Sequence, residues 1–525
     1  MDSPIFTSTQ MRETEEAAFA HGVEAEALMD QAGAGVARAI AKFFPHPGKC
    51  IVFSGKGHNA GDALVAAECL RERGWKIEVR LAFKESDCSE LMRKKLDALR
   101  RAPAQIPDAS DIGATLVELL TEVGDDLAVE QDAVAAEAYF GTASRTIILD
   151  GLLGLGAKSP LRNPVRKACR HINDLRRKKN AYVFAVDLPT GLDGDSGETD
   201  PNCVVADFTV TIGFAKRGLL ADNVLDFVGR IEVVSLPDLK PGTATPSELL
   251  ATRNSLGPLL PRRRFSAYKN QFGRIGVVAG SKGFIGAALM TAQGALRAGA
   301  GLVEVFVPEE IYSIVAASAP QESMVKPVQA YRDLLNEKID IWALGPGLGK
   351  SRAAEILNLI EDAEQPMVVD ADGLNVLSEK IDILKQCRGP RLLTPHPGEM
   401  KRLFDFAKMS RAHTARNFCE QYPVSLLLKG SRTIVCERGK PLSYNSTGNP
   451  GMASGGMGDV LTGVCAGLVG QGLSLYDAAR LGAWVCGRAG EMSIFNGWQS
   501  EESLLSRDVL NHLGNAFNEL HNSPV

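Results

Sequence analysis

Short apolar runs that lead into glycine alternate with helical segments along nearly the whole chain. The clearest of these runs are CIVFSGKG (50–57), TIILDGLLG (146–154), YVFAVDLPTG (182–191), FTVTIGFAK (208–216), GRIGVVAG (273–280), LVEVFVP (302–308), DIWALGPGLG (340–349), PMVVDADG (366–373), RLLTPHPGE (391–399) and VSLLLKGSRTIVC (424–436). Continuous apolar strands separated by helices predict parallel sheets that are buried on both faces. We therefore expect an α/β fold built from doubly wound, three-layer Rossmann-like domains.

At 525 residues the chain is too long for one core, so we expect more than one domain. Residues 236–260 are rich in Pro, Thr and Ser and have no clear period, which predicts a linker with one short helix. The domains would then span 1–235 and 261–525. Residues 85–143 are charged, favour helix by composition and carry no chemical motif, so we interpret them as a peripheral helical insertion.

Composition excludes several classes of protein. Apolar residues make up 45% and charged residues 23%, as in globular proteins, and the net charge of −5 disfavours a nucleic-acid partner. No run of about 18 apolar residues predicts a membrane span, and the first residues do not resemble a signal peptide. The ten cysteines form no CxxC pair, which indicates reduced thiols rather than a zinc site. We expect a cytoplasmic protein.

The segment SGKGHNAGDALVAAECL (54–70) predicts a strand, a glycine loop and a helix. Glycines let the backbone approach a ligand, and the start of the helix offers free N–H groups to a phosphate. Asn59 and Asp62 add polar groups at that mouth. The alternative is an ordinary turn between strand and helix in which Asp62 caps the helix.

Two further strands of the first half end in acids, Asp150 and Asp187. In doubly wound sheets, ligands bind beyond the carboxyl ends of strands at a switch point. A carboxylate directly after an apolar strand is costly without a partner, and a cation or a hydroxylated ligand relieves that cost. Asn59, Asp150 and the Thr190 hydroxyl supply hard oxygen ligands suited to an alkali or alkaline-earth cation.

The first half resembles the YjeF N-terminal domain, a family that contains NAD(P)H-hydrate epimerases. The resemblance rests on TSTQMRETEEAAFAHGVEAEALMDQAGAGVARAI and on the three loops above. The family loop GNNGGDG is here GHNAGDA, with His58, Ala60 and Ala63 as the departures. The resemblance implies potassium ligands at Asn59, Asp150 and Thr190, and proton transfer by Asp187. It implies a substrate site formed by His58, Asn59, Ala60, Gly61, Asp62, Gly154, Leu155, Gly156, Ala157, Lys158, Ser159, Pro160 and Asp187.

The most specific motif of the chain is NPGMASGGMGDVLTG (449–463) in the second half. Gly455, Gly456 and Gly458 precede a helix, and such a loop presents several N–H groups to a transferring phosphoryl group. Because a carboxylate repels phosphate, Asp459 is best interpreted as the base that takes a proton from a substrate hydroxyl. The alternative is that Asp459 only caps the helix.

Other loops of the second half are weaker signals. Lys429 follows a strand and suits a nucleotide phosphate, although a lone lysine is usually solvated. His396 sits in a Pro-bounded turn, where histidine is usually structural. The run VVDADGLN (368–375) ends a strand in two acids, of which one would orient magnesium or the ligand, or Asp372 would cap a helix.

From about residue 262 the chain resembles the YjeF C-terminal domain, a ribokinase-like family of ADP- or ATP-dependent NAD(P)H-hydrate dehydratases. The runs that carry this are GSKGFIGAALMTAQGALRAGAGLVEV, LGPGLG, DADGLN, LTPHPGEM, LKGSRT and GNPGMASGGMGDVLTG. One departure is YKNQFG (268–273), where the family often has HKGxFG. The resemblance implies substrate contacts at Ala287, Gly347, His396 and Asp459. It implies a nucleotide site at Lys429, Gly430, Ser431, Arg432, Thr433 and Gly458.

The order of the two halves resembles that of bifunctional NAD(P)H-hydrate repair enzymes. This resemblance implies epimerisation of the R and S hydrates NADHX and NADPHX, and dehydration of the S form with Mg²⁺ and ADP, preferred to ATP. It implies K⁺ in the first half and a homo-oligomer without nucleic-acid or membrane partners. The alternatives are a ribokinase-like small-molecule kinase and a non-catalytic, ligand-sensing or interaction N-domain.

Overall fold

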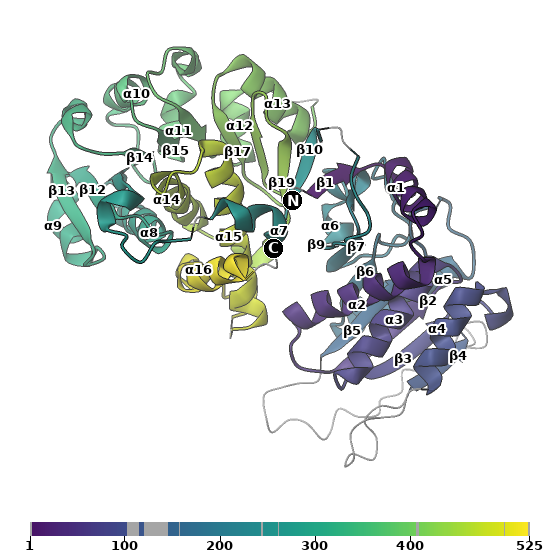
Figure 1. Cartoon of the computed structure of the whole chain (residues 1–525). Coiled ribbons are helices and arrows are strands. Elements are labelled where there is room, and N and C mark those ends of the chain that lie inside the picture. The colour runs from purple at the N-terminus through teal and green to yellow at the C-terminus, as the bar shows by residue number, and fades with distance from the viewer. Residues whose placement is uncertain are drawn as a thin grey trace, which may run out of the picture. The chain divides into compact units, whose positions relative to one another are not determined.

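A computed structural model describes residues 3–101, 115–119, 145–156, 158–242, 245–260, 262–405, 409–497 and 499–522. The chain divides into two compact units (Figure 1). The N-terminal unit is Pro4–Ala244, and the C-terminal unit is Thr245–Val525 together with Met1–Ser3. Within the described residues no helix is long and apolar enough to cross a membrane.

The N-terminal unit is built on a parallel sheet with the strand order β4-β3-β2-β5-β6-β7-β9. Its strands are β2 (Lys49–Ser54), β3 (Lys76–Leu81), β4 (Thr115–Leu119), β5 (Thr146–Gly151), β6 (Tyr182–Val186), β7 (Phe208–Ile212) and β9 (Arg230–Val234). The chain runs outward from β2 to β4 and then returns to β5, so the switch point lies between β2 and β5. A short parallel pair, β1 (Ser3–Phe6) with β8 (Ala215–Lys216), belongs to the same half of the chain.

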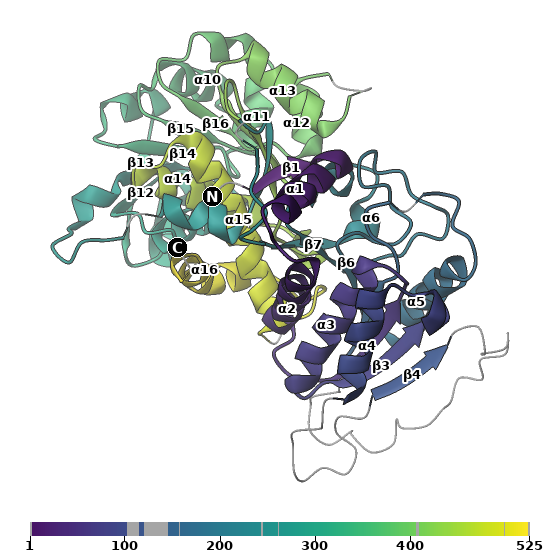
Figure 2. The same ribbon diagram turned by 45° about the vertical axis from the view of Figure 1, so that its right-hand side comes forward.

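Helices cover both faces of this sheet. The helices are α1 (Ser8–Ala20), α2 (Ala25–Phe43), α3 (His58–Glu72), α4 (Glu90–Arg101), α5 (Val165–Lys179) and the short α6 (Leu225–Val228). Figure 2 shows α2, α3 and α4 side by side, and α5 contacts β5 and β6. The helices α2 and α3 approach closely at Gly33 because this residue has no side chain. A Cβ added there would lie only 2.4 Å from the Cβ of Val65.

The C-terminal unit has a longer sheet, with the order β13-β12-β11-β14-β15-β16-β17-β18-β19-β10. Its strands are β10 (Glu248–Ala251), β11 (Arg274–Val278), β12 (Leu302–Pro308), β13 (Ser323–Val328), β14 (Ile341–Leu344), β15 (Met367–Val369), β16 (Arg391–Leu393), β17 (Ser425–Leu428), β18 (Ile434–Glu437) and β19 (Leu442–Asn445). Neighbouring strands are parallel except at β18, which is antiparallel to β17 and β19. The switch point lies between β11 and β14.

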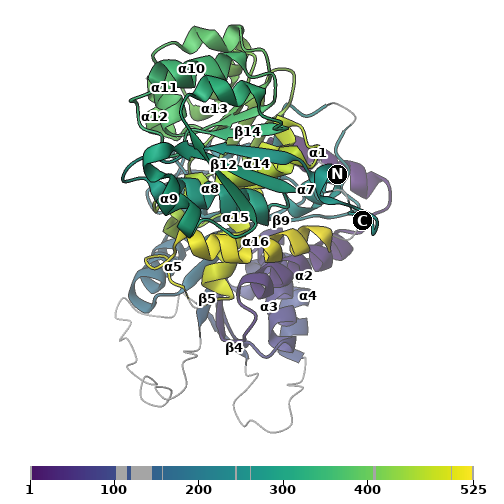
Figure 3. The same ribbon diagram turned by 90° about the vertical axis from the view of Figure 1, so that its left-hand side faces the viewer.

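Two sets of helices sandwich this sheet, as Figure 3 shows. On one side lie α8 (Ile285–Arg297), α9 (Glu309–Ser318), α14 (Met457–Gly470) and α15 (Leu475–Phe495), with α16 (Ser506–His521) packed on α15. On the other lie α10 (Ala353–Asp362), α11 (Asp372–Leu377), α12 (Pro397–Leu403) and α13 (Arg411–Gln421). Small residues let α8 and α14 touch, since a Cβ on Gly463 would lie 2.0 Å from the carbonyl oxygen of Thr291. The predicted α/β class with doubly wound layers is confirmed.

Two sequence-based boundaries need correction. The expected linker 236–260 contains the short helix α7 (Arg253–Leu256), but it also contains β10, which pairs with β19 because its apolar residues are buried there. The unit boundary lies inside that stretch, between Ala244 and Thr245. The expected helical insertion 85–143 holds α4 but also β4, which extends the sheet beside β3. Residues 102–114 and 120–144 lie outside the described residues.

Candidate functional sites

Three predicted cation ligands meet at the switch point of the N-terminal unit. The Thr190 hydroxyl donates to Asp150 Oδ1 at 2.7 Å, and the Thr190 backbone N–H donates to Asp150 Oδ2 at 2.8 Å. The Nδ2 of Asn59 donates to the carbonyl oxygen of Leu153 at 3.1 Å, while the Leu153 N–H donates to Thr190 Oγ1. The loops after β2, β5 and β6 therefore place amide, carboxylate, hydroxyl and carbonyl oxygens in one cluster.

Asp150 is fully buried at the end of β5. Burial raises its pKa to about 6, although the hydrogen bonds from Thr190 and Leu152 act in the opposite direction. An ionised carboxylate in such a place is stabilised by a nearby cation. The chemistry of the site therefore fits a hard monovalent cation held by oxygen atoms.

Asp187 follows β6 with a left-handed backbone, φ +68°, which is uncommon for a residue with a side chain. Its Oδ1 accepts from the Ile212 N–H at 3.0 Å and from the Thr211 hydroxyl at 3.3 Å. The ammonium of Lys216, which is completely buried, donates to the same oxygen. The acid is thus anchored by β7 and β8 at the edge of the switch-point loops.

Two more acids stand in the electrostatic environment of Asp187. Burial raises the pKa of Asp62 well above its usual range, and the charges of Asp187 and Glu15 raise it further. Burial also raises the pKa of Glu15, with Asp187 adding to the shift and Lys216 opposing it. Three carboxyl groups and one ammonium therefore share this region, and they do not all ionise with equal ease.

The two expected substrate loops lie against each other, since a Cβ on Gly154 would be 3.4 Å from Asn59 Cβ. Gly57 is the N-cap of α3, so the alternative that Asp62 caps this helix is wrong. Gly61 serves packing, because a Cβ there would lie 2.4 Å from Met29 Sδ. The remaining residues of the loops are the exposed His58 and Lys158, the buried Ala60, the partly exposed Leu155, the left-handed Gly156, Ser159, which donates to Asp200, and Pro160. Ala157 lies outside the described residues.

In the C-terminal unit a buried carboxylate organises the carboxyl ends of β15 and β17. Asp370 Oδ1 accepts from Lys429 Nζ at 2.7 Å, and its Oδ2 accepts from the Thr462 hydroxyl at 2.8 Å. Lys429 also lies 3.9 Å from the buried Glu399. Lys429 is therefore a partly buried lysine that is paired with an acid.

Asp459 stands beside this pair in the first turn of α14. Burial raises its pKa to about 6, and the charge of Asp370 adds to the shift while Lys429 opposes it. The N-cap of α14 is Gly456, at φ +86°, and no side chain caps the helix. Asp459 is therefore the third residue of the helix, and the alternative in which it is the cap is wrong.

The start of α14 lies next to the same pair. Gly458 lies over the pair, since a Cβ there would be 3.3 Å from Lys429 Nζ and 3.4 Å from Asp370 Oδ2. The start of a helix with its first N–H groups free favours an anion. An acid, an ammonium and the start of a helix are thus gathered at one end of the sheet, an arrangement that suits phosphoryl transfer.

Gly347 and Ala287 come together across the switch point, where a Cβ on Gly347, at φ +65°, would be 3.0 Å from Ala287 Cβ.

His396 is the N-cap of α12, and its Nδ1 accepts from the Gly398 N–H at 3.0 Å. Asp372 is not a cap, because Ala371 holds that position, and Asp372 instead accepts from the Gly349 N–H at 2.9 Å. His396 therefore has a structural role whatever else it contacts.

Residues 430–433 form the turn between β17 and β18. Gly430 has φ +142° and Arg432 has φ +56°. Thr433 donates to the Gly430 carbonyl at 3.2 Å, and Arg411 donates to the Ser431 carbonyl at 2.8 Å. The structure thus separates Lys429, which points into the acid cluster, from the rest of the expected nucleotide run.

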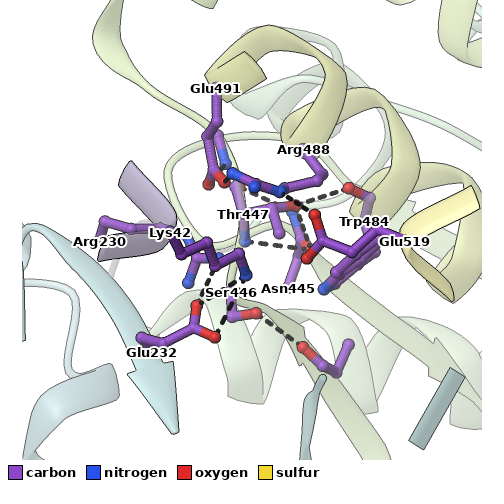
Figure 4. Close-up of polar contacts among 12 residues, drawn as sticks. Lys42, Arg230, Glu232, Asn445, Ser446, Thr447, Trp484, Arg488, Glu491 and Glu519 are labelled. Carbon is purple, nitrogen blue, oxygen red and sulfur yellow. Dashed lines mark hydrogen bonds and ion pairs between the residues drawn. The ribbon is translucent and has the colours of Figure 1, made fainter. Parts of the chain in front are cut away.

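A buried ion-pair network holds the start of the glycine loop (Figure 4). Arg488 Nη1 lies 3.0 Å from Glu491 Oε2, and its Nε lies 2.7 Å from Glu519 Oε2. Glu491 Oε1 accepts from the Gly448 N–H at 2.8 Å, so α15 and α16 fix the segment that leads to Gly456. Breaking such a buried pair is costly, which makes the loop a rigid support for the anion site.

Sequence reasoning missed Lys216, Asp370 as a specific residue, and Thr462. Asp370 carries the same signal as Asp150 and Asp187, an acid directly after a buried strand. Thr462 carries no signal, because it is one polar residue inside an apolar helix. Lys216 carries none either, because nothing in GFAKRG distinguishes a buried lysine from a solvated one.

Both halves of the chain match family models. Residues 25–218 match the model described as YjeF-related protein N-terminus, and residues 275–510 match the model described as NAD(P)H-hydrate dehydratase. A crystal structure of the ADP/ATP-dependent NAD(P)H-hydrate dehydratase from Bacillus subtilis, co-crystallised with ATP and Mg²⁺, is 25% identical with a TM-score of 0.45. That match covers 52% of this chain and 98% of the other.

Curated relatives match nearly the full length. The bifunctional NAD(P)H-hydrate repair enzyme Nnr of Moorella thermoacetica is 34% identical over 93% of this chain and 91% of its own. The proteins of the same name from Coxiella burnetii and Escherichia coli are 33% and 32% identical, over 97% and 91% of this chain and 98% and 87% of their own.

Two doubly wound α/β units, each with buried acids at the carboxyl ends of its strands, define a two-domain enzyme. The full-length matches identify which one. The chain belongs to the family of bifunctional NAD(P)H-hydrate repair enzymes.

Proposed function

We propose that the N-terminal unit equilibrates the R and S hydrates of NADH and NADPH, and that the C-terminal unit dehydrates the S hydrate with ADP. The observation that carries this proposal is the grouping of Asp459, Lys429 and Asp370 under the free N–H groups of α14. ATP is the alternative phosphoryl donor. The homo-oligomeric state and the cytoplasmic location stay predictions.

In the epimerase unit, Asp187 moves the proton. Inverting the hydrated carbon requires ring opening or reversible loss of the hydroxyl group, and each needs a positioned acid or base. The contacts described for Asp187 all end on Oδ1, so Oδ2 is the oxygen that meets the substrate. Asp62, whose pKa is raised by burial, lies near this acid.

Asn59, Asp150 and Thr190 hold K⁺ in this proposal. Oxygen donors of three chemical kinds fit a weakly polarising cation, and the burial of Asp150 supplies the reason for one. When bound by these residues, K⁺ would supply positive charge that holds the loops after β2, β5 and β6 together and attracts the substrate's phosphates. His58 and the loop 154–160 then lie along the dinucleotide.

In the dehydratase unit, Asp459 takes the proton of the substrate hydroxyl as its oxygen attacks the terminal phosphoryl group of ADP. The bond between the terminal phosphorus and the bridging oxygen of ADP breaks, and AMP leaves. Phosphate then leaves the hydrated carbon, the neighbouring carbon loses a proton to water, and the carbon–carbon double bond of the reduced ring forms. The start of α14 and Lys429 stabilise the charge on the transferring group. Ala287, Gly347 and His396 line the substrate side, and residues 430–433 with Gly458 line the nucleotide side.

Mg²⁺ accompanies the nucleotide. The described residues contain no group of three or more His, Cys, Asp or Glu side chains arranged to hold a metal. This fits a Mg²⁺ ion that is held mainly by nucleotide phosphates and water, with one or two carboxylates. Glu399, 3.9 Å from Lys429 Nζ, is a carboxylate other than the base that would fit the role, and Mg²⁺ would neutralise charge on the phosphates.

The test uses pure S hydrate of NADH with Mg²⁺ and either ADP or ATP, followed by analysis of the products. The proposal predicts NADH, inorganic phosphate and AMP from ADP, with a higher kcat/KM for ADP than for ATP. A stable phosphorylated hydrate would instead show a small-molecule kinase. Pure R hydrate tests the N-terminal unit, and failure to convert it would leave that unit as a non-catalytic module.

A further inference from the structure

Lys216 is a fully buried charged side chain near the proposed epimerase site. It lies in β8, paired with Phe6 of β1, and its exposed fraction is 0%. Its ammonium donates to Asp187 Oδ1, to the Ile212 carbonyl at 2.9 Å and to the Thr211 hydroxyl at 3.3 Å. An ammonium has three hydrogens, so these three acceptors use all of them.

Packing alone does not explain why a lysine occupies this buried position. Burying an ammonium costs several kcal/mol, and an apolar side chain of similar size would fill the same space without that cost. Because its three donors are used and its surface is buried, Lys216 does not touch a substrate. Its effect must therefore pass through the groups that it holds.

Lys216 holds Asp187, the acid of the proposed epimerase site. The hydrogen bonds that the described residues make to Asp187 all end on Oδ1. The bond from Lys216 and the bond from the Ile212 N–H fix the rotation of the carboxylate, while the left-handed backbone at φ +68° aims it. These bonds leave Oδ2 as the oxygen that is available to a substrate.

Two further acids lie in the electrostatic environment of Asp187. Asp62 on α3 and Glu15 on α1 interact with it as like charges, and Arg12 acts on Glu15. Lys216 contacts Asp187 directly and places one positive charge among these three acids.

We propose that Lys216 is a positioning residue for epimerisation: it fixes the orientation of the Asp187 carboxylate, with Oδ1 engaged and Oδ2 presented to the substrate. This inference rests on the proposed function, in which Asp187 moves the proton. Lys216 itself neither donates nor accepts that proton.

A double-mutant cycle on the full chain tests the proposal, with conversion of pure R hydrate as the readout. Asp187→Asn is expected to lower kcat at least 100-fold. Lys216→Gln and Lys216→Met are expected to lower kcat about 10- to 100-fold with less than a threefold change in KM. Added to Asp187→Asn, either Lys216 change is expected to have no further effect, because it acts only through Asp187.

The pH profile adds a readout that a merely structural role would not move. In Lys216→Gln the acidic limb of kcat/KM is expected to shift to higher pH, whereas Lys216→Arg, which keeps the charge, retains the wild-type limb. Thr211→Val is the matched comparison, since it removes a neutral donor to the same oxygen and should move the limb less than Lys216→Gln does. Dehydratase activity on S hydrate and the melting temperature check folding, and Lys216→Gln is the variant to use if Lys216→Met does not fold.

The outcomes separate the two ideas. If Asp187→Asn retains full activity, the proposed function of the N-terminal unit is wrong. If Asp187→Asn is inactive but the losses of the Lys216 variants multiply with it, or the acidic limb does not move, only the role of Lys216 is overturned.

Discussion

Lys429 Nζ lies 2.7 Å from Asp370 Oδ1 beneath the first turn of α14, where Gly458 leaves room for both. The two residues come from β15 and β17 loops that are 59 positions apart in the sequence. Their pairing joins the acid after one strand to the cation after another, next to the proposed base Asp459. The dehydratase site is therefore one electrostatic unit.

Removing one partner of this pair is expected to cost more than removing both. Lys429→Met leaves Asp370 buried and uncompensated, so we expect a loss of about 3–5 kcal/mol in the free energy of unfolding and a higher KM for ADP. The double variant Lys429→Met with Asp370→Asn is expected to recover stability but not the KM. Denaturant unfolding and steady-state kinetics measure the two effects. Equal stability of the single and double variants would contradict the pairing.

Asp459→Asn is expected to lower kcat for dehydration by roughly 10²–10⁴-fold, the usual contribution of a general base. Asp477→Asn is the matched control, because Asp477 is the third residue of α15 as Asp459 is of α14. We expect the control to keep full activity. If both variants were equally active, Asp459 would not be the base.

The pKa of Asp459 predicts the pH dependence of dehydration. Because the base must be ionised and its pKa is about 6, kcat/KM is expected to rise with pH through 6 to a plateau. Lys429 lowers this pKa and Asp370 raises it. The limb should therefore move to higher pH in Lys429→Met and to lower pH in Asp370→Asn. Limbs that do not move, or move the other way, would contradict the assignment.

Stability should change in the opposite sense to activity. The folded-state pKa of Asp459 lies above that of the unfolded chain, so wild-type stability from this group is present below about pH 4 and lost as pH rises through 6. Asn does not ionise, so Asp459→Asn should be more stable than wild type at pH 8, by no more than about 3 kcal/mol. Urea unfolding at pH 4 and pH 8 measures this difference, which should vanish at the lower pH.

Potassium binding is expected to depend on Thr190. In wild type, KCl should raise the melting temperature of the N-terminal unit above its value in tetramethylammonium chloride of equal concentration. Thr190→Val should remove this difference. Thr209→Val is the control, since Thr209 is a buried threonine of the same sheet that donates to the Val228 carbonyl. A salt effect that persists in Thr190→Val would rule out a cation at this site.

The close contact between α8 and α14 predicts an effect on the free energy of unfolding. Gly463→Ala places a Cβ 2.0 Å from the Thr291 carbonyl oxygen, so α14 must move, at a cost of about 1–3 kcal/mol or more. Gly514→Ala in α16 meets no atom within 4 Å and should gain up to about 1 kcal/mol in helix propensity. Chemical denaturation gives both values. A neutral Gly463→Ala would mean that the close contact does not position α14.

The sequence was sufficient for the layered α/β fold because its strands are continuous apolar runs. The sequence also indicated that the acids at strand ends are candidate site residues, because an acid directly after a buried strand is rare without a partner. It could not reveal β4 or β10, whose pairing depends on strands elsewhere in the chain. For the same reason it could not reveal that Lys216 is buried or that Lys429 is paired with an acid, because only the fold brings their acids into reach.

We propose above that Asp187 of the N-terminal unit and Asp459 of the C-terminal unit act in succession on the R and S hydrates. The direct test is to give wild type, Asp187→Asn and Asp459→Asn an equal mixture of R and S NADH hydrates with K⁺, Mg²⁺ and ADP, and to follow the absorbance of reduced nicotinamide. To see the epimerase, spontaneous interconversion of the hydrates is measured without enzyme and subtracted. We expect wild type to restore the full absorbance of reduced nicotinamide, Asp187→Asn to restore the half that comes from the S hydrate, and Asp459→Asn to restore none. Full recovery with either variant would contradict the proposal.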